Sequence, residues 1–272
     1  MQALGNDYVY MDCIRQAPPE DPAALAVEIS RPHTGIGADG LILILPSKIA
    51  DARMQIFNAD GSEAGMCGNG IRCVGKFLYD SGLCRKEKLR IESKSGVRLL
   101  HMQIENGVAA GASVDMDPPR FEAENVPVLC SDPQALEIEA AGRKLRFFCL
   151  SMGNPHAVAF YWPEDEFFYA AAPLLEKHPL FPDRANIEFA DVIGEHEMRM
   201  RVWERGSGET MACGTGATAC AVAAIRLGLC KSPVLVHLPG GDLTIEWQEG
   251  ASAFMTGPAF ASFSGNWPAI LA

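Results

Sequence analysis

The sequence predicts a mixed α/β protein built from two similar halves. Two segments 146 residues apart share one pattern without a gap, namely CGNGIRCVGKFLYDSGLC at 67–84 and CGTGATACAVAAIRLGLC at 213–230. Each begins with Cys-Gly-x-Gly, continues with a helix-like stretch and ends with Gly-Leu-Cys. Because self-similarity at a fixed offset marks repeated structural units, we expect two domains of related fold.

Further matches occur in the same order along the two halves. LGNDY near residue 5 resembles MGNPH near residue 153, and ASVDMDPPRF (112–121) resembles ASAFMTGPAF (251–260). A glutamate, Glu63 or Glu209, stands four residues before each leading cysteine. The matches place the first domain at 1–114, completed by the tail 259–272, and the second at 115–258.

The strands and helices follow from local patterns. The repeated helices should begin at Cys-Gly-x-Gly and end at Gly82 and Gly228, because glycine readily adopts the left-handed conformation that ends a helix. In the first helix, Ile71, Val74 and Leu78 share one face. The second is apolar almost all round, so we expect it to be buried on every side, as by a curved sheet. Apolar alternation or short apolar runs predict strands at 41–45, 52–57, 88–93, 97–104, 197–204, 234–238 and 243–247.

Composition narrows the function classes. The 272 residues are 48% hydrophobic, which is enough for a sizeable core, and the net charge of −11 disfavours nucleic acid and anionic membranes as partners. No apolar run is long enough to span a bilayer, and the start, MQALGNDYVYMD, does not resemble a signal peptide. Nine cysteines without an export signal suggest a reducing compartment. We therefore expect a cytoplasmic protein.

Cys67 and Cys213 lie at or just before the two helix N-termini. The free backbone N–H groups and the helix dipole there favour negative charge, so we expect a thiol pKa lowered towards thiolate. The Gly-Asn-Gly and Gly-Thr-Gly segments could hold a substrate carboxylate. Two such motifs suggest a cleft with a thiol on each wall.

Other roles for these two thiols stay open. They could be buried small apolar residues, a disulfide or zinc ligands, although the sequence has no Cys-x-x-Cys or His-x-x-x-His pair for a metal site. The other cysteines are interpreted as core or surface thiols: Cys13, Cys73, Cys84, Cys130, Cys149, Cys220 and Cys230.

Motifs for common cofactors are absent or misplaced. GIGADG (35–40) formally matches a dinucleotide-binding motif, but it precedes a predicted strand, which favours a turn. Pyridoxal phosphate requires a Schiff-base lysine, and Lys76 is better interpreted as solvated on the polar side of its helix. Glu204-Arg205 follows a predicted strand and suits a substrate clamp, with an exposed ion pair as the alternative. The other candidate loop residues, each compatible with ordinary turn chemistry, are Asn6, Asn58, Asn154, His156 and Asn186.

A family resemblance covers nearly the whole chain. LGNDY, GIGADG, IFNADGSEAGMCGNGIRC, SMGNPH, HPLFPDRANIEF, ERGSGETMACGTGA, LPGGDLTIEW and MTGPA resemble the diaminopimelate epimerase family, in order and at family-like spacing. Proline racemase and its relatives have a related fold, but the SMGNPH and ERGSGET contexts resemble the diaminopimelate branch.

The resemblance implies a fold and a reaction. The fold would be two pseudo-symmetric domains, each a curved mixed sheet around a central helix, commonly in a homodimer. The reaction would interconvert LL- and meso-2,6-diaminopimelate, for lysine and peptidoglycan precursors, without pyridoxal phosphate or a metal. Cys67 and Cys213 would be the acid/base residues, and His156 and Glu204 would help to set their protonation. The substrate-binding residues would be Asn6, Asn58, Gly68, Asn69, Asn154, Asn186, Glu204, Arg205, Gly214 and Thr215.

The chain departs from the family pattern at two places. Members usually carry several residues before the first motif, which form most of their first strand, whereas LGNDY begins here at Leu4. Gly40 stands where some members carry a substrate-side glutamine, so it is given no role. Two alternative functions remain: an epimerase or racemase of another amino acid, or a non-catalytic redox or binding module in which Cys67 and Cys213 pair.

Overall fold

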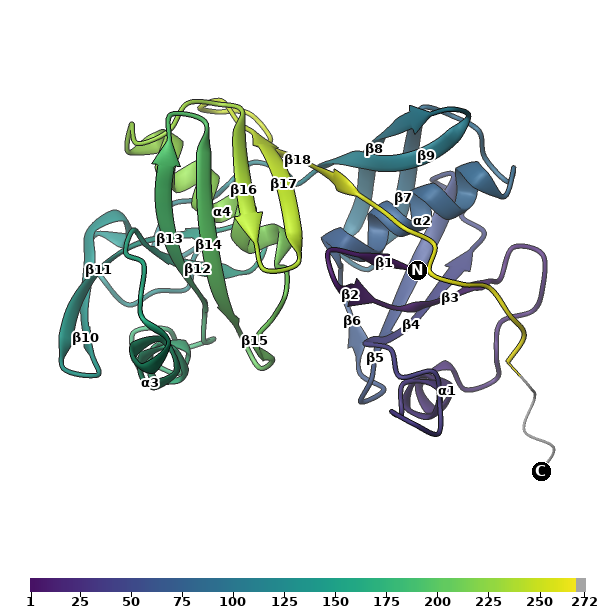
Figure 1. Ribbon diagram of the computed structural model, residues 1–272, viewed down its shortest axis with the longest axis horizontal. Coiled ribbons are helices and arrows are strands. Elements are labelled where there is room, and N and C mark those ends of the chain that lie inside the picture. Colours follow the sequence, from purple (N-terminus) through teal and green to yellow (C-terminus); the bar gives the residue numbers. More distant parts are fainter. Residues whose placement is uncertain (268–272) are drawn as a thin grey trace. The chain divides into compact units, whose positions relative to one another are not determined.

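Two structural units make up the chain in the computed structural model, which describes residues 1–267 (Figure 1). The first unit contains Met1–Ala112 and the segment from Pro258 onward, and the second contains Ser113–Gly257. The chain therefore leaves the first unit and returns to it within a strand each time, β9 (Val108–Asp115) and β18 (Phe254–Pro258). Residues 268–272 of the predicted tail lie outside the described residues.

Both units contain strands, one long central helix and one outer helix. The first has β1 (Gln2–Ala3), β2 (Asn6–Asp7), β3 (Val9–Asp12), α1 (Pro22–Ile29), β4 (Gly40–Leu45), β5 (Ala52–Asn58), β6 (Glu63–Ala64), α2 (Gly68–Asp80), β7 (Lys88–Ser93), β8 (Gly96–Glu105) and most of β9. The second has a 3₁₀ turn (Pro133–Ala135), β10 (Leu136–Ala140), β11 (Arg143–Ser151), β12 (Pro155–Ala159), α3 (Asp165–Glu176), β13 (Asn186–Gly194), β14 (Glu197–Glu204), β15 (Gly208–Glu209), α4 (Gly214–Arg226), β16 (Val234–Leu238), β17 (Gly241–Glu246) and most of β18.

The strand pairing of the first unit is repeated in the second. In the first unit, β3–β4 and β5–β7 are parallel pairs, whereas β4–β5, β5–β6 and β7–β8 are antiparallel pairs. In the second, β12–β13 and β14–β16 are parallel, whereas β13–β14, β14–β15 and β16–β17 are antiparallel. Each unit therefore holds a mixed sheet with a helix at the same place in its topology, which confirms the predicted fold class.

The two repeated helices have the predicted boundaries. Cys67 and Cys213 are the N-cap residues of α2 and α4, and both have extended backbone angles. Gly82 and Gly228 follow the last turns with φ of +75° and +71°, in the left-handed region where glycine has no Cβ penalty. The seven predicted strands are also confirmed.

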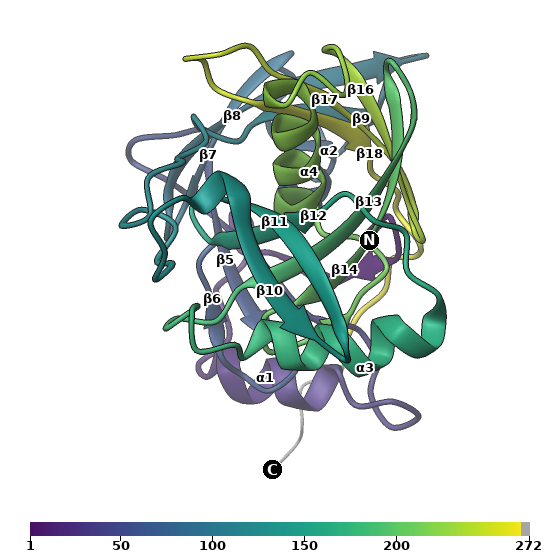
Figure 2. The same cartoon turned by 90° about the vertical axis from the view of Figure 1, so that its left-hand side faces the viewer.

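The helix α4 is enclosed by its own unit. Every residue from Gly216 to Ala224 is buried, and the helix contacts strands β11 to β14, β16 and β17. Figure 2 shows it passing through the interior of the second unit, as its composition predicted. In α2, Ile71, Val74 and Leu78 are also buried.

The prediction that Lys76 is solvated was wrong. Its side chain is only 13% exposed, because Nζ reaches the Ala109 carbonyl oxygen at 2.6 Å and Asp80 at 2.8 Å. The ammonium therefore has fixed partners on the helix and on β9.

The outer helices were not identified from the sequence. α1 packs on β4 and β5, and its N-cap Asp21 accepts a hydrogen bond from Ala24 N. α3 packs on β10, β13 and β14 through Phe168 and its neighbours, although Pro173 lies inside it.

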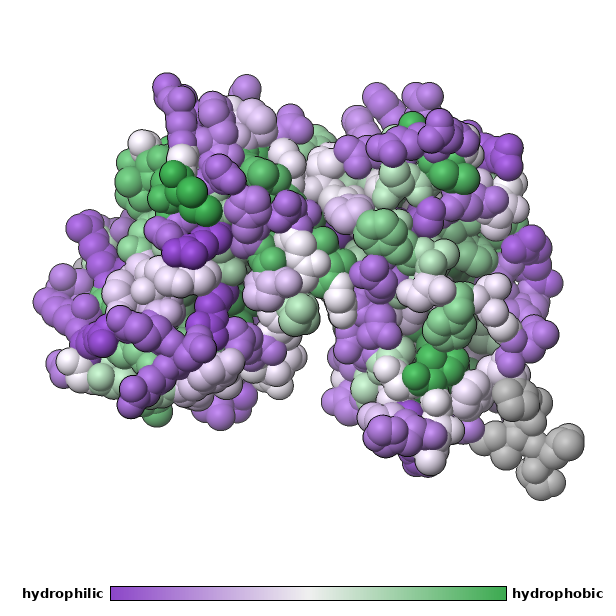
Figure 3. Space-filling model, in the orientation of Figure 1, coloured by the Kyte–Doolittle hydropathy of each residue, from purple (hydrophilic) through white to green (hydrophobic). Residues whose placement is uncertain are grey.

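Hydrophilic residues predominate on the face drawn in Figure 3, with apolar residues in separate patches on both units. Among the described residues, none of the helices has the length and apolar character to cross a bilayer.

Candidate active site

The Cys67 thiol lies between a helix N-terminus and an asparagine. Its Sγ accepts a hydrogen bond from Gly70 N at 3.2 Å and donates one to Asn6 Oδ1 at 3.3 Å. Asn6 is itself held in β2, because its Nδ2 donates to Asp39 Oδ2 at 2.7 Å. The helix start and the fixed amide therefore define where the sulfur lies.

Two other predicted residues of the first unit take part in the surrounding framework. Asn58, at the end of β5, accepts a hydrogen bond from Tyr8 Oη at 3.4 Å and donates to Ser62 Oγ at 3.0 Å. The Asn69 side chain is buried, and its Oδ1 accepts from Arg72 Nη2 at 2.9 Å. The Asn69 side-chain oxygen is therefore already engaged by Arg72.

Arg72 is a site residue that the sequence analysis missed. It is fully buried, and besides Asn69 it donates to the Gly68 and Pro258 carbonyl oxygens, both at 3.2 Å. Burial lowers the pKa of its guanidinium, while the nearby Cys73 and Cys67 thiols act in the opposite direction. Arg72 thus secures the first turn of α2 from inside.

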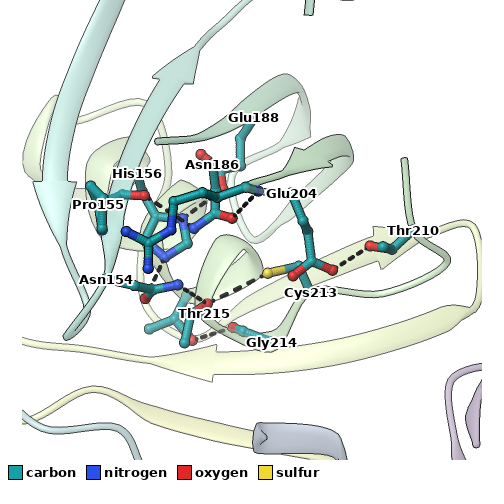
Figure 4. A network of polar contacts seen from close by, with 12 residues as sticks. Asn154, Pro155, His156, Asn186, Glu188, Glu204, Thr210, Cys213, Gly214 and Thr215 are labelled. Atoms are coloured by element: carbon teal, nitrogen blue, oxygen red, sulfur yellow. Dashed lines mark hydrogen bonds and ion pairs between the residues drawn. The ribbon is translucent and has the colours of Figure 1, made fainter. Parts of the chain in front are cut away.

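The Cys213 thiol is reached by a chain of polar side chains, drawn in Figure 4. Thr215 Oγ1 lies 3.5 Å from Cys213 Sγ, and Asn154 Nδ2 donates to that hydroxyl at 3.4 Å. Asn154 Oδ1 is 2.9 Å from His156 Nε2, and His156 Nδ1 is 2.6 Å from Glu188 Oε1. Five side chains, from the turn before β12, from β12 and β13, and from the start of α4, are thus linked.

The remaining predicted residues of the second unit stand at the ends of β13 and β14. Asn186 Oδ1 accepts from the backbone of Arg205 at 2.9 Å, and its Nδ2 donates to the Pro155 carbonyl at 3.1 Å. Glu204 accepts from Thr210 Oγ1 at 2.5 Å. Arg205 is exposed, and its guanidinium donates to the Asp183 carbonyl oxygen at 3.0 Å. Asn186 therefore fixes the loop that carries Glu204 and Arg205.

The structure groups the predicted residues around one thiol in each unit. Asn6, Gly68 and Asn69 lie around Cys67, whereas Asn58 bonds to Tyr8 and Ser62 in the same unit. The residues around Cys213 are Asn154, His156, Asn186, Glu204, Arg205, Gly214 and Thr215. The repeated glutamates do not join either group. Glu63 forms an ion pair with Lys94, and Glu209 forms one with Arg201 and accepts from Tyr169.

The expectation of a lowered thiol pKa is wrong at Cys213. Burial raises the pKa of this thiol well above its usual value, and the carboxylates of Glu204 and Glu188 raise it further. Hydrogen bonding to Thr215 and to the Gly216 backbone lowers it by less. The cost of placing a charge in a closed interior outweighs the helix N-terminus here.

Sequence reasoning also missed Glu188, Asp39 and Thr210. Glu188 left a signal, because the segment IEFA (187–190) places one carboxylate among apolar residues. Asp39 and Thr210 lie in loops and were paired with the site only by the fold. None of the nine cysteines forms a disulfide, and residues 1–267 contain no group of three or more His, Cys, Asp or Glu residues arranged to hold a metal ion.

The fold is similar to that of solved epimerase-like structures. A hydroxyproline epimerase from Agrobacterium vitis superposes with a TM-score of 0.66 over 96% of this chain and 89% of that chain. Its sequence identity is 18%, so the likeness concerns the fold alone.

Sequence comparison gives a closer relationship. The chain is 48% identical to the diaminopimelate epimerase of Pelotomaculum thermopropionicum, over 97% of this chain and 96% of the relative. It is 46% identical to that of Acetivibrio thermocellus, over 98% and 96%. The family model described as Diaminopimelate epimerase matches residues 1–122 and 148–261. This chain, with a cysteine thiol at the start of the central helix in each of its two units, belongs to the diaminopimelate epimerase family.

Proposed function

We propose that this protein is an isomerase that interconverts LL- and meso-2,6-diaminopimelate, with Cys67 and Cys213 as its two acid/base residues. The observation that carries the proposal is the repeated thiol. In each unit a cysteine stands at the N-cap position of the central helix and lies in hydrogen-bonding reach of an asparagine or threonine side chain. Two equivalent thiols in a member of this family supply the two proton carriers that a two-base inversion requires.

Inversion of a stereocentre without redox chemistry requires that a proton leaves one face of the carbon and another arrives at the opposite face. In the proposed reaction one sulfur, as thiolate, removes the α-proton, and the other, as thiol, donates a proton to the opposite face. The roles are exchanged in the reverse direction. A positioned acid or base typically contributes about 10²–10⁴-fold to the rate.

The carbanion that develops at the α-carbon needs stabilisation by fixed positive potential. The backbone N–H groups at Gly68-Asn69 and Gly214-Thr215 are those of helix N-termini, which favour a carboxylate. We propose that they bind the carboxylate at the reacting carbon and stabilise the charge that spreads into it.

The other charged ends of the substrate match the remaining side chains. Arg205 can bind a carboxylate with two parallel N–H donors, and Glu204 can bind an ammonium group. Asparagine carries both a donor and an acceptor and can therefore bind either end. We propose these substrate-binding roles for Glu204, Arg205, Asn6, Asn58, Asn154 and Asn186, with His156 and Glu204 also influencing thiol protonation.

Three further proposals accompany the activity. The reaction uses protein thiols alone, without pyridoxal phosphate or a metal. The protein acts in the cytoplasm, where its nine cysteines remain reduced. It forms a homodimer, which sedimentation equilibrium would test as a mass of twice 29.3 kDa.

Exchange in D₂O tests the reaction directly. The reduced protein is incubated with LL-diaminopimelate in D₂O, and the α-deuterium content and the stereoisomers are followed. We expect deuterium to enter at the α-carbon as the meso isomer forms. If neither exchange nor inversion occurs, the enzyme assignment is wrong.

Removal of single thiols tests the two-base mechanism. Cys67→Ala and Cys213→Ala should each abolish inversion, because each removes one of the two proton carriers. Cys84→Ala, which removes a partly buried thiol outside both frameworks, is the matched control and should retain activity. Full activity in either of the first two variants would refute the mechanism.

A further inference from the structure

The Cys213 framework contains a buried acid–base pair for which the fold alone gives no reason. Glu188 and His156 are both 0% exposed. Burial of such a pair is costly, and well-packed apolar residues usually stabilise a protein as well or better. The Oε2 atom of Glu188 is buried and has no hydrogen-bond partner within residues 1–267, which adds to the cost.

The internal repeat provides the comparison. Glu188 pairs with Val158 across β12 and β13, and the position with the same register in β3 and β4 is Ile42. Both side chains press on a glycine of the central helix. A Cβ on Gly216 would lie 2.9 Å from Glu188 Oε1, and one on Gly70 would lie 2.8 Å from Ile42 Cδ1. An aliphatic side chain thus serves at this place in the first unit, so the carboxylate in the second has another purpose.

The hydrogen bonds that connect Glu188 to Cys213 through the intervening side chains have a direction. Asn154 Nδ2 donates to Thr215 Oγ1, so Asn154 Oδ1 faces the imidazole and His156 Nε2 must carry a hydrogen. The 2.6 Å contact between His156 Nδ1 and Glu188 Oε1 then holds one more proton. Because the Thr215 oxygen accepts from Asn154, its own hydrogen can be directed at Cys213 Sγ, 3.5 Å away.

We propose that Glu188 is a positioning residue for the Cys213 thiol: through His156, Asn154 and Thr215 it orients a hydroxyl donor towards the sulfur. Its catalytic consequence rests on the proposed function, whereas its effect on the thiol does not. The pair carries no net charge while it shares its proton, so it orients the chain without adding a net negative charge next to the sulfur.

The donor matters because the other neighbours of Cys213 disfavour the thiolate. The Glu204 carboxylate faces the sulfur, and Glu188 itself would oppose ionisation if it were charged and unpaired. The Cys149 and Cys220 thiols also lie within the electrostatic reach of Glu188. A hydroxyl hydrogen aimed at Sγ stabilises the ionised sulfur directly.

The pH dependence of alkylation at Cys213 tests the proposal without substrate. Iodoacetamide modification is followed by mass spectrometry of the Cys213 peptide, and the Cys67 peptide of the same molecules is the internal reference. We expect Glu188→Leu, which removes the partner of His156 Nδ1, to raise the apparent pKa of Cys213 by about 0.5 or more, and that of Cys67 to stay unchanged. If Glu188 acts only through its charge, the variant will instead lower the Cys213 pKa, and the proposal fails.

Thr215 variants test whether Glu188 influences the Cys213 pKa through the hydrogen-bonded side chains between them. Thr215→Val removes the terminal hydroxyl and should raise the Cys213 pKa by a similar amount, whereas Thr215→Ser should restore it. Thr218→Val is the matched control, because that hydroxyl donates to Gly214 O in the same helix but is outside the chain. In the double variant Glu188→Leu/Thr215→Val the shift should not exceed the larger single shift, and additive shifts would overturn the proposal.

A second replacement guards against misfolding of Glu188→Leu. Glu188→Ile installs the residue of the equivalent position and should also raise the Cys213 pKa; an unchanged pKa in a folded Glu188→Ile protein would overturn the proposal. In the epimerase assay, Glu188→Leu should lower kcat/KM about tenfold and move its basic limb to higher pH. A loss that is the same at every pH would indicate a merely structural role. Absence of turnover in the wild-type protein would refute the proposed function and leave the alkylation test intact.

Discussion

Arg72 is a buried cation that donates to two backbone oxygens and to one side-chain oxygen. Its planar guanidinium presents several donors at fixed angles and satisfies Asn69 Oδ1 and the Gly68 and Pro258 carbonyls together. A lysine ammonium would keep the charge but could not reach three acceptors in this geometry. We expect Arg72→Lys to lower the free energy of unfolding by about 3 kcal/mol, measured by urea denaturation.

The exposed Arg85 provides the control for this prediction. Arg85→Lys makes the same chemical change at the surface, where it should alter stability by less than about 0.5 kcal/mol. Equal losses of stability in Arg72→Lys and Arg85→Lys would contradict a structural role for the Arg72 guanidinium.

At the residue scale, the sequence predicted side chains that stand beside recognisable local patterns. Cys67 and Cys213 were found because a glycine-rich helix start follows each of them. Glu188 was missed because its importance depends on His156, which stands 32 residues earlier in the chain and becomes its neighbour only through the parallel β12–β13 pairing. Arg72 was missed because its partner at Pro258 is 186 residues away.

The same limit explains the error in the thiol pKa. A helix N-terminus is visible in the sequence, but the closed surroundings of Cys213 are not. Long-range packing therefore decided the sign of the shift.

At the scale of elements, His237 links three strands of the second unit. Its Nε2 lies 2.8 Å from Glu197 Oε1 of β14, and its Nδ1 lies 2.7 Å from Asp242 Oδ1 of β17. Hydrogen bonds to Glu197 and then Asp242 raise the pKa of the imidazole above its ordinary 6.5. Because the folded-state pKa is the higher one, the stabilisation is fully present below pH 6.5 and is lost as pH rises through the raised pKa.

Comparison of the wild type with His237→Gln measures this contribution. Since the ring is one-third exposed, solvent screening limits the contribution, and we expect a difference of about 1 kcal/mol at pH 6 that declines towards pH 9. His196→Gln provides the control, because the hydrogen-bond partners of that imidazole are the Lys231 and Pro233 carbonyl oxygens. If the stability difference between the wild type and His237→Gln instead grows with pH, the protonated imidazole does not stabilise the fold.

The close packing of α4 gives a second prediction at this scale. Ala223 is 0% exposed within an enclosed helix, so a larger side chain there must displace its neighbours. We expect Ala223→Leu to destabilise the protein by about 2–3 kcal/mol, measured by thermal denaturation. Ala170→Leu, on the exposed side of α3, makes the same change without burial and should be nearly neutral.

The elements differed in how well the sequence indicated them. α2 and α4 have a start and a stop within their own residues, so their boundaries could be predicted. α3 has no side chain that caps its N-terminus and contains Pro173, and it forms because Phe167, Phe168 and Leu175 pack against the sheet. Tertiary packing, and not local propensity, accounts for this helix.

On the scale of the whole molecule, only one of the two units is formed by a single continuous stretch of the chain. The second is one uninterrupted stretch, Ser113–Gly257, whereas the first requires the residues after Pro258. Those residues are tied to it by paired hydrogen bonds between Gln2 and Phe260, both 2.9 Å, and by Ala259 N to Ala110 O at 3.0 Å. The Arg72 bond to the Pro258 carbonyl adds a buried contact.

Truncation of the chain after Gly257 tests whether the first unit depends on the C-terminal segment that returns to it. Each lost hydrogen bond is worth about 1 kcal/mol, and together with the burial of Ala259 their loss is a large fraction of the 5–15 kcal/mol that is typical of a whole domain. We expect amide hydrogen exchange to accelerate strongly in α2 and β4 while protection in α4 and β13 changes little, because each unit has its own core. The amides of the second unit serve as the internal control within the same sample. Equal loss of protection in both units would mean that they unfold as one, and unchanged protection in α2 would mean that the returning segment does not stabilise the first unit.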